Sequence, residues 1–443
     1  MRITVANYCD LLEEDSYRID SEFWDERLIQ SEVQVRTDFC IRDLVSPQKE
    51  VDKLTVADSP INYLEISDVD LDSTMYQLNL IQPESVPSRA TYLLRKDDVA
   101  VSMVRPSRNA VSFIQSDEIV ASSGFTILRP TRVSAEYLWA FCKTEFFRRY
   151  LTRRQRNSMY PAVRKEDILN APIYMADSEI EHQIASKIEE STKRLKLHYQ
   201  EYENIQFDFL KFIEFRLIQS SDRRAFIRFF SDVIAAKRLD AKFFDLSFSA
   251  VDRSFRRCSR TLKLGDIASL QKGVEVGKEQ YMDEGIPFVR VSDISRHSLR
   301  FNKMIDKEVF EQYSFSRIQQ DDILFTKDGT VGMVHYIGYE PIPMLTSSGV
   351  IRLRIQNDWL PSYYLAMVLD SPMIRLQFER ECSGSNISHW NLDRVRDCRI
   401  PILDQPIMES FDKRLQYVYK EIANARDGIV DAIAMLNQIL SVE

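Results

Sequence analysis

The residues with the clearest chemistry in this sequence form one short basic segment. Between Lys143 and Lys165 there are eight basic residues and one acidic residue, Glu145, a local net charge of +7 in a chain of net charge −8. The basic residues are Lys143, Arg148, Arg149, Arg153, Arg154, Arg156, Arg164 and Lys165. Residues 1–142 carry 14 basic and 24 acidic residues, so the positive charge is segregated. Arginine forks clamp phosphates in two-point contacts. The segment therefore predicts a nucleic-acid surface, and the alternative is a solvated helix face balanced by a neighbouring acidic surface or partner.

Motifs of catalysis are missing from the sequence. It has no Gly-rich phosphate loop of either common spacing, no H-E-x-x-H zinc motif, no G-x-S-x-G nucleophile motif and no Asn- or Asp-Pro-Pro-Tyr methyltransferase tetrapeptide. The five histidines are dispersed, and none pairs with a cysteine at ligand spacing, so they are expected to be surface or locally satisfied residues. Asp321, Asp322 and Lys327 could imitate a nuclease site, but acidic residues before a strand are commonly a solvated turn. We expect no catalytic residue, no metal and no cofactor in this chain.

The chain contains an internal repeat. Arg18–Asp25 returns as Arg238–Asp245, and five further short matches follow in order, with offsets that lie between 220 and 229. They pair Tyr63–Val69 with Phe288–Ile294, Asp97–Val99 with Asp321–Ile323, Ser122–Gly124 with Ser347–Gly349, and Tyr137-Leu138 with Tyr364-Leu365; Pro172-Ile173 and Pro401-Ile402 close the series. Matches in register predict two homologous halves of about 220 residues. Arg18, Asp20, Phe23 and their copies Arg238, Asp240 and Phe243 are expected to have packing or salt-bridge roles.

Each half begins with a globular part and ends with a long helix. Short apolar runs alternate with turn residues up to about residue 175 and again from 260 to 403, which predicts strands, whereas Glu136–Thr152 and Tyr363–Arg380 have helical spacing. Both globular parts are thus expected to be mixed α and β. The predicted limits are residues 1–176 and 220–403 for the globular parts, and 177–219 and 404–443 for the helices.

The two predicted helices carry apolar stripes. In the second helix a three-four alternation includes Phe411, Leu415, Val418, Ile422, Ala425, Ile429, Ile433, Leu436 and Leu440, with Gly428 as a tolerable interruption. The first has a less regular stripe, which includes Ile180, Ile184, Ile188, Leu195, Tyr202, Phe209, Ile213 and Leu217. Some 35 residues make a rod of about 50 Å. Such rods would pair with each other in a coiled coil, or each would pack on its own domain.

Composition excludes several classes of protein. Hydrophobic residues make up 44% and charged residues 28% of the chain, which is not the composition of a disordered protein. At 443 residues the chain is too long for one compact core. The negative net charge excludes a histone-like binder. Six scattered cysteines without a C-x-x-C pair indicate reduced thiols. No apolar run approaches a membrane span, so we expect a cytoplasmic protein.

Two strings in the second half resemble a known family. Gly285–Ile294 (GIPFVRVSDI) and Asp321–Gly332 (DDILFTKDGTVG) are similar to the target-recognition domain of type I restriction-modification specificity subunits. Ser347-Ser348-Gly349, Ser371-Pro372 with Arg375, Ser383-Gly384-Ser385 and Arg399–Ile402 follow in the order that family shows. The first half is a more diverged copy, because Arg105–Asn109 stands where the second half has Lys327–Val331 and Asn157-Ser158-Met159 replaces the Ser-Gly-Ser loop.

The resemblance implies an α+β fold with two homologous mixed α/β target-recognition domains, separated by two long helices that form an antiparallel coiled coil with pseudo-two-fold symmetry. It also implies a non-catalytic DNA-binding subunit that reads a bipartite, asymmetric target in double-stranded DNA and docks methyltransferase subunits and restriction subunits. S-adenosylmethionine would be bound by the partner methyltransferase. The alternatives are a recognition module of another phage-defence or DNA-modification assembly, and a coiled-coil adaptor that binds protein.

Polar loops between strands are expected to read bases, because short donors and acceptors must reach the groove. The candidate DNA-binding residues of the first domain are Arg105, Ser107, Arg108, Asn109, Arg153, Arg154, Arg156 and Asn157. Those of the second are Lys327, Asp328, Ser383, Ser385, Asn386, Ser388, His389 and Asn391. The structural alternative is that Asp328-Gly329 and Ser383-Gly384-Ser385 simply turn the chain. Trp24, Trp139, Trp359 and Trp390 are expected in the core.

Overall fold

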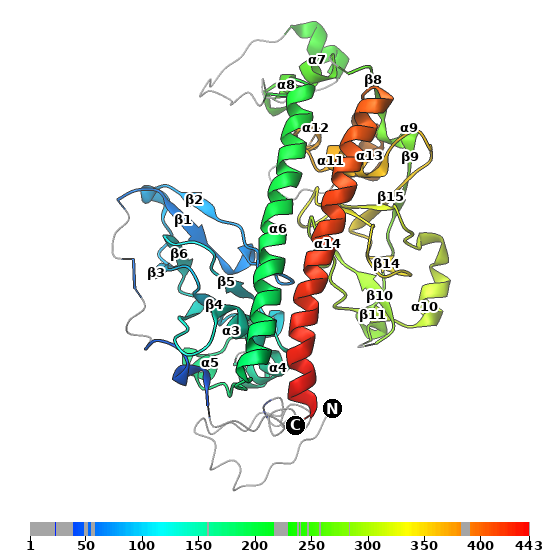
Figure 1. Ribbon diagram of the computed structural model, residues 1–443. Coiled ribbons are helices and arrows are strands. Elements are labelled where there is room, and N and C mark those ends of the chain that lie inside the picture. Colours follow the sequence, from blue (N-terminus) through cyan, green and yellow to red (C-terminus); the bar gives the residue numbers. More distant parts are fainter. Residues whose placement is uncertain are drawn as a thin grey trace. The chain divides into compact units, whose positions relative to one another are not determined.

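The chain divides into two compact units in the computed structural model (Figure 1). The structure describes residues 23, 39–47, 52–54, 58–156, 159–216, 229–236, 239, 241–245, 248–256, 258–282, 284–381 and 390–442. Unit 1 is Met1–Lys196 with Asn424–Glu443, and unit 2 is Leu197–Ala423. The long helices α6 (Ser178–Phe212) and α14 (Gln405–Val442) contribute a segment to each unit. The predicted domain limits stay a prediction.

Unit 1 contains two small sheets built from the predicted apolar runs. The first has the order β2-β1-β6-β3, with β1 (Ile61–Leu64) parallel to β6 (Ile119–Ser122) and antiparallel to β2 (Asn79–Ile81), while β3 (Ala90–Leu94) is antiparallel to β6. The second is antiparallel, with β4 (Val99–Ser102) between β5 (Val111–Phe113) and β7 (Phe125–Leu128). Every residue of β4, β5, β6 and β7 is buried, so these strands form the core of the unit.

Three helices follow the sheets of unit 1. They are α3 (Ala135–Cys142), α4 (Glu145–Arg154) and α5 (Lys165–Leu169). Ser134 begins α3 and accepts a hydrogen bond from the backbone N–H of Tyr137, and Thr144 begins α4 in the same way through Phe147. These caps satisfy backbone donors that the first turn leaves unpaired. All of α3 except Glu136 is buried, which explains its nearly continuous apolar sequence.

Unit 2 has the same kinds of strand pairing. A parallel pair joins β10 (Ile286–Val289) to β14 (Leu345–Thr346), with β11 (Met304–Ile305) antiparallel to β10. An antiparallel sheet has the order β13-β12-β15-β9, made of β13 (Val334–Tyr336), β12 (Ile323–Thr326), β15 (Val350–Ile355) and β9 (Ala268–Lys272). A further antiparallel pair joins β8 (Arg260–Lys263) to β16 (Arg399–Ile402).

The shorter helices of unit 2 include a pair that matches α3 and α4. This pair is α11 (Ser362–Leu369) and α12 (Pro372–Glu381). The others are α7 (Phe230–Ala236), α8 (Ser249–Phe255), α9 (Leu264–Ile267), α10 (Lys307–Gln312) and α13 (Leu392–Asp397). The repeat read from the sequence thus returns in the strand pairings: β1 with β6 corresponds to β10 with β14, and β4 with β7 corresponds to β12 with β15.

The apolar stripes of the two long helices are buried. In α14 every stripe residue is at most 8% exposed except Ile433, which is half-buried while the neighbouring Ala432 takes the buried position. In α6 the stripe from Ile184 to Ile213 is fully buried, Ile180 is half-buried, and Leu217 lies outside the described residues. Among the described residues, the expected stripes are therefore buried except at Ile433 of α14 and Ile180 of α6.

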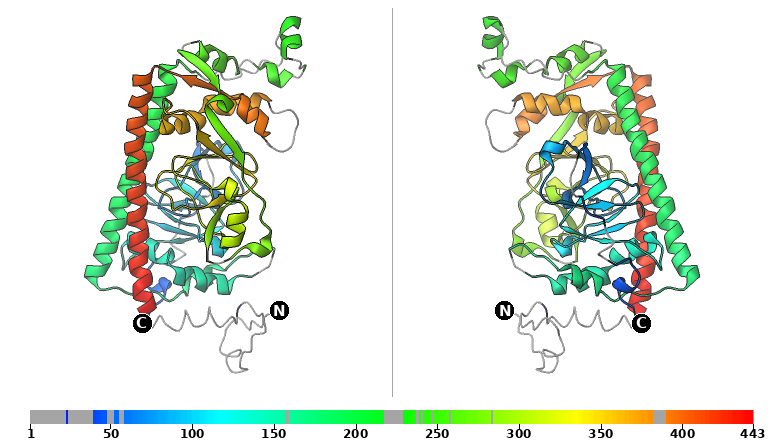
Figure 2. Two further views of the ribbon diagram at one scale, coloured as in Figure 1. Left: turned by 90° about the vertical axis from the view of Figure 1, so that its right-hand side faces the viewer. Right: turned by 90° about the vertical axis from the view of Figure 1, so that its left-hand side faces the viewer.

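Within each unit the segments of α6 and α14 lie side by side and run antiparallel (Figures 1 and 2). In unit 1 the Lys187 ammonium lies 3.0 Å from the Asp431 carboxylate. Gly428 packs so closely on α6 that a Cβ atom there would lie 2.4 Å from Ser191 Oγ, so this glycine is needed for the close approach. In unit 2 the Arg414 guanidinium binds Asp208 at 2.9 Å, and the Phe209 and Phe411 rings meet edge to face.

Candidate nucleic-acid interface

The predicted base-reading loop of unit 1, residues 105–109, is an exposed loop on a rigid base. It contains one 3-10 turn, Pro106–Arg108, between two residues in the left-handed conformation, Arg105 (φ 50°) and Asn109 (φ 51°). Pro106 is buried and anchors the turn, whereas Arg105, Ser107 and Arg108 are exposed. The Lys143 ammonium donates to the Asn109 carbonyl at 2.8 Å. The loop therefore holds two guanidinium groups and a hydroxyl toward solvent.

A second segment of the basic region lies directly beside this loop. Arg156 and Ala162 exchange two backbone hydrogen bonds of 2.7 and 3.0 Å, and Ala162 also bridges to Val104. The Arg105 N–H donates to the Pro161 carbonyl at 2.7 Å. Two stretches about 50 residues apart in sequence are thus tied into one surface, as a base-reading surface requires.

Several arginines of the basic segment are already paired with acids. Glu145 accepts hydrogen bonds from both Arg148 and Arg149, and Asp167 pairs with Arg156 at 2.5 Å. Burial would raise the pKa of Glu145, but the two guanidinium groups hold it below its ordinary value. For Arg148 and Arg149 the alternative interpretation therefore applies, because these two arginines lie on a helix face where an acidic residue balances their charge. The exposed positive charge gathers instead at Arg105, Arg108 and Arg164.

Arg153 requires a correction of its expected role. Its side chain is 6% exposed, its Nε donates to the Phe23 carbonyl at 2.6 Å, and its guanidinium lies 4.2 Å from the centre of the Phe23 ring. We therefore assign Arg153 to packing, since a buried and engaged guanidinium cannot reach DNA. Arg154 is half-buried and stacks on the Tyr150 ring at 3.6 Å. Asn157 lies outside the described residues.

The corresponding loop of unit 2, residues 327–333, joins β12 to β13 as a hairpin. Gly329 (φ 65°) and Gly332 (φ 82°) adopt the left-handed conformation, so Asp328-Gly329 forms the turn that was its structural alternative, and contact of Asp328 with DNA stays a prediction. Lys327 and Asp328 form an ion pair of 2.6 Å, and the Lys327 side chain is only 16% exposed. This loop presents less free charge than its counterpart in unit 1.

The remaining candidates of unit 2 are only partly described. Asn391 begins α13, and its side chain accepts a hydrogen bond from the Asp393 N–H, a capping role that leaves its amide group able to donate. Ser383, Ser385, Asn386, Ser388 and His389 lie outside the described residues. Their expected contacts with DNA stay predictions.

Two of the tryptophans are in the core, as expected. Trp139 is fully buried, and Trp390 is 7% exposed and stacks on Phe378 with ring centres 3.9 Å apart. A Cβ atom at Gly332 would lie 2.8 Å from the Trp390 ring, so this glycine makes room for it. Trp359 is half-buried under the Arg260 guanidinium, and Trp24 lies outside the described residues.

The acidic pair Asp321 and Asp322 is structural. The Asp322 carboxylate is fully buried and takes two hydrogen bonds of 2.7 Å from the Arg354 guanidinium. Asp321 accepts a hydrogen bond from the Tyr336 hydroxyl. Both carboxylates therefore have hydrogen-bond partners within unit 2. Among the residues that the structure describes, no group of three or more metal-ligating side chains comes together, and no helix there is both long and apolar enough to cross a membrane.

A loop on each globular part attaches it to the helix pair of its own unit. In unit 1, Asp70 binds Arg426 of α14 at 2.7 Å, and the Thr74 and Thr192 hydroxyls share a hydrogen bond of 2.8 Å. In unit 2, Arg296 binds Asp370 at 2.8 Å and Glu203 of α6 at 2.7 Å. These contacts join the globular part of each unit to the helix segments of that unit. Asp70 and Arg296 belong to corresponding loops of the repeat.

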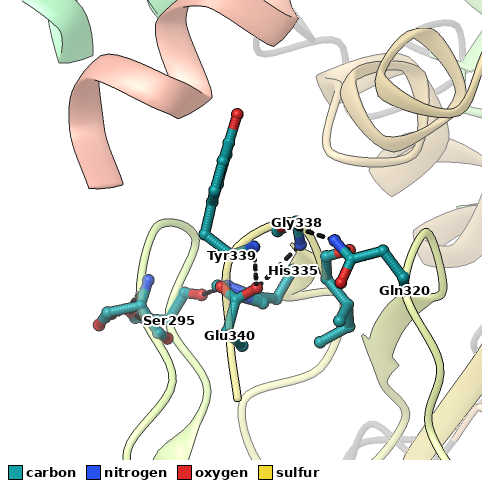
Figure 3. A network of polar contacts seen from close by, with 8 residues as sticks. Ser295, Gln320, His335, Gly338, Tyr339 and Glu340 are labelled. Atoms are coloured by element: carbon teal, nitrogen blue, oxygen red, sulfur yellow. Dashed lines mark hydrogen bonds and ion pairs between the residues drawn. The ribbon is translucent and has the colours of Figure 1, made fainter. Parts of the chain in front are cut away.

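Figure 3 shows how the Arg296 loop is held in unit 2. His335 is 2% exposed, with Nδ1 3.0 Å from the Ser295 carbonyl and Nε2 2.6 Å from Glu340. Glu340 also accepts from the N–H groups of Gly338 and Tyr339. Burial would raise the pKa of Glu340, but His335 and these donors hold it below its ordinary value. His335 is thus locally satisfied, as the sequence predicted for the histidines.

Comparison with known proteins finds a family match in the second half of the chain. The profile described as "Type I restriction modification DNA specificity domain" matches residues 259–426. This part of the chain is therefore similar to the specificity domain of type I restriction-modification systems. The specificity subunit of the Escherichia coli type I restriction enzyme EcoBI is 23% identical to it over 184 residues, a match that spans 40% of this chain and 38% of that protein.

Solved structures of specificity subunits are also similar to this chain. The HsdS subunit from Thermoanaerobacter tengcongensis is 18% identical, with 91% of this chain and 95% of that chain covered and a TM-score of 0.32. The S subunit of a type I restriction-modification system from M. genitalium is 12% identical, with 92% and 97% covered and a TM-score of 0.38.

Sequence reasoning missed two side chains at the interface of unit 1. Met159 is 82% exposed and Tyr160 is 67% exposed, beside Pro161 and Ala162 of the pinned segment. The signal was available, because two large apolar residues interrupt a run of arginines. Periodicity does not reveal such residues, because it explains apolar residues only where they face a core.

Proposed function

We propose that this chain is the DNA-reading subunit of a type I restriction-modification complex. Each globular part reads one half of a bipartite, asymmetric target in double-stranded DNA, and the catalytic steps belong to separate methyltransferase and restriction subunits. The observation that carries the proposal is the exposed 105–109 loop of unit 1, tied to the Arg156–Ala162 segment and surrounded by exposed arginines. Such a function requires access to DNA, so we expect the chain in the cytoplasm.

The asymmetry of the target follows from the difference between the two loops. Arg105, Ser107 and Arg108 offer donors to base edges and phosphates, and a guanidinium near base edges prefers guanine. Lys327 is paired with Asp328, so the loop of unit 2 presents a different set of donors and acceptors. Different side chains select different bases, and a target with two unlike half-sites results.

The long helices act as a spacer in this proposal. Helices of 35 and 38 residues are about 50 to 57 Å long, which exceeds one turn of B-DNA of roughly 34–36 Å. An antiparallel coiled coil of that length, related by a pseudo-two-fold axis, would set the separation of the half-sites. The contacts between the two helices within each unit support antiparallel pairing.

The helices also offer a surface for the partner subunits. Leu197 and Phe207 of α6 and Tyr417 of α14 are 63%, 65% and 58% exposed, all in unit 2. Exposed apolar side chains of this size on a helix pair are typical of a protein interface. We assign them to methyltransferase docking, and that partner would bind the S-adenosylmethionine.

The proposal is tested by mapping modified bases across the genome of the source cell, with and without this gene. Loss of methylation at one bipartite, asymmetric motif is the expected result. If no motif loses methylation, footprinting of the chain with its methyltransferase partner decides, and absence of sequence preference there would refute the proposal. A stable complex with other proteins and no DNA affinity at low salt would instead favour a coiled-coil adaptor.

A variant test addresses the surface directly. Replacing Arg105 and Arg108 together by Ala should weaken DNA binding and lower the slope of log affinity against log salt by about 1.8, since each phosphate contact contributes about 0.9. The matched control is Arg148→Ala with Arg149→Ala, which removes the same charge from arginines already paired with Glu145. Equal slopes for the two variants would remove the 105–109 loop from the DNA surface. Arg153 is left intact because its burial makes it a folding residue.

A further inference from the structure

Two large apolar side chains project from the basic surface of unit 1. Met159 is 82% exposed and Tyr160 is 67% exposed. Neighbouring residues of the same segment are packed, since Val163 is buried and Pro161 and Ala162 are half-buried. Among the described residues 159–163, Met159 and Tyr160 are thus the exposed ones, and a thioether and a phenol ring meet water there.

The base from which they project is fixed by hydrogen bonds. Arg156 and Ala162 close the segment with two backbone bonds, Val163 N–H donates to the Met103 carbonyl at 2.9 Å, and Arg105 N–H donates to the Pro161 carbonyl at 2.7 Å. The Arg156 guanidinium is held in turn by Asp167. Little conformational entropy of the base remains to be lost on binding, so apolar side chains on it can insert at low cost.

The charge around the pair favours a polyanion as its occupant. Arg105, Arg108 and Arg164 are exposed on the two stretches that meet here, and Asp167 is neutralised by Arg156. A duplex supplies both kinds of contact that this surface offers, since its phosphates pair with guanidinium groups and its base steps accept apolar side chains. Proteins that insert such side chains partly unstack a base step and kink the duplex.

We propose that Met159 and Tyr160 form a wedge that enters a base-pair step in the half-site read by unit 1, while Arg105, Arg108 and Arg164 hold the flanking phosphates. This inference rests on the proposed function. The wedge makes the step itself part of the target, because pyrimidine–purine steps unstack more easily than others. Specificity at that step would need no hydrogen bond to a base edge.

The experiment uses the full chain in complex with its methyltransferase subunits and the duplex target found by methylation mapping. 2-Aminopurine is placed in turn at each step of the half-site, and its fluorescence reports unstacking. The test variant is Met159→Ala with Tyr160→Ala. The matched control is Phe315→Ala, which removes a side chain of similar exposure, 62%, from unit 2. Tyr160→Phe keeps the ring and should behave as the wild type.

For the wild type we expect enhanced fluorescence at one step, and for the double variant loss of that signal with affinity about tenfold or more lower, the size expected for one lost stacking contact. The salt dependence should stay unchanged, because no charge is removed. Wild-type affinity and fluorescence in the double variant would overturn the wedge while leaving the proposed function intact. Loss of methyltransferase binding with unchanged DNA affinity would show that the pair docks a protein, and would also overturn it. A wild-type complex without sequence preference would refute the proposed function itself.

Discussion

The globular parts of unit 1 and unit 2 share their internal polar contacts and differ in the loops that face outward. In unit 1 the Asp98 carboxylate is buried and takes two hydrogen bonds, of 2.8 and 2.9 Å, from Arg129. In unit 2 Asp322 does the same with Arg354. The carboxylates begin corresponding strands, β4 and β12, and each also accepts a backbone N–H three residues upstream. The pair is therefore part of the scaffold that both globular parts share.

A second shared contact joins the start of each half to its helices. Arg153 binds the Phe23 carbonyl and covers its ring at 4.2 Å, and Arg380 binds the Phe243 carbonyl and covers its ring at 4.4 Å. The packing role expected for Phe23 and Phe243 is confirmed by this arrangement, since both are buried. Arg18, Asp20, Arg238 and Asp240 of that motif lie outside the described residues. The contact between an arginine and a phenylalanine is thus present in both halves although their sequences have diverged. Neither the sequence pattern nor the charge count predicted this contact.

The outward loops differ in kind. Unit 1 places Arg105 and Asn109 in the left-handed conformation, whereas unit 2 places Gly329 and Gly332 there. Non-glycine residues in this conformation strain the backbone of the unit 1 loop but place side chains at its turn. Glycines avoid that strain in the unit 2 loop and leave those positions without side chains. A scaffold that tolerates both solutions allows the reading residues to change without loss of the fold.

The largest effect is expected from breaking the shared ion pair. Asp98→Asn should destabilise unit 1 by about 3 kcal/mol, because the Arg129 guanidinium loses its buried, hydrogen-bonded anionic partner in a largely buried site. Asp322→Asn should cost unit 2 less, because the Arg354 side chain is 32% exposed whereas Arg129 is 16% exposed. Hydrogen exchange followed by mass spectrometry, which resolves the two units, measures both.

The control for this pair is Asp52→Asn, which removes an exposed partner of Arg95 and Arg129 and should change the stability by less than about 1 kcal/mol. If Asp98→Asn and Asp52→Asn have equal effects, the repeated pair is not what holds the scaffold.

The contacts of Asp70 in unit 1 and Asp370 in unit 2 should respond to pH in opposite directions. Their effect on stability should be smaller than that of the shared ion pair. Burial would raise the pKa of Asp70, but the charge of Arg426 and local hydrogen bonds hold it below its ordinary value of 3.8. Burial outweighs Arg296 and Tyr202 at Asp370 and raises its pKa. The contribution of Asp70 is therefore present above pH 3.8 and lost as the pH falls through its lower folded pKa. The contribution of Asp370 is complete below pH 3.8 and lost as the pH rises through its higher folded pKa.

The variants Asp70→Asn and Asp370→Asn test this contrast through the pH dependence of the free energy of unfolding. At pH 7, Asp70→Asn should cost about 2 kcal/mol, since it breaks a hydrogen-bonded charge pair, and Asp370→Asn should cost less. On acidification toward pH 4 the cost of Asp370→Asn should grow, while that of Asp70→Asn should stay constant. Urea unfolding at several pH values, with each unit followed by hydrogen exchange, tests this. Parallel pH profiles for the two variants would contradict the assignment of opposite shifts.

Much of the fold could be predicted from the sequence, because repetition and periodicity are properties of the sequence itself. The matches at Asp97–Val99 and Asp321–Ile323 mark the strand starts where the shared ion pairs lie, and the three-four alternation predicts the buried stripe of α14. Burial of Ala432 in place of Ile433 could not be predicted, because a straight helix drifts relative to a seven-residue repeat.

The candidate site was predictable in position and less so in detail. The 105–109 loop is exposed as a reading loop must be, but local charge counting placed Arg153 on the surface although it lies under Phe23. A partner 130 residues away in sequence decides that burial, and no local pattern encodes it. Glu145 likewise pairs with two arginines that the count left unpaired.

The smallest effect should come from exchanging the turn residues of the two outward loops. Gly329→Val should destabilise unit 2 by about 1–2 kcal/mol, because an L-residue with a branched Cβ is strained at φ 65°, whereas Gly329→Asn should cost less than about 1 kcal/mol. The added Cβ would lie 3.4 Å from Val291, an ordinary contact, so backbone strain dominates. Asn109→Gly in unit 1 should be nearly neutral, since relief of strain is offset by the greater freedom of the unfolded chain. Thermal unfolding ranks the three variants. A large cost for Asn109→Gly would mean that its side chain holds the loop, and then the two loops would differ in their support as well as in the groups they present.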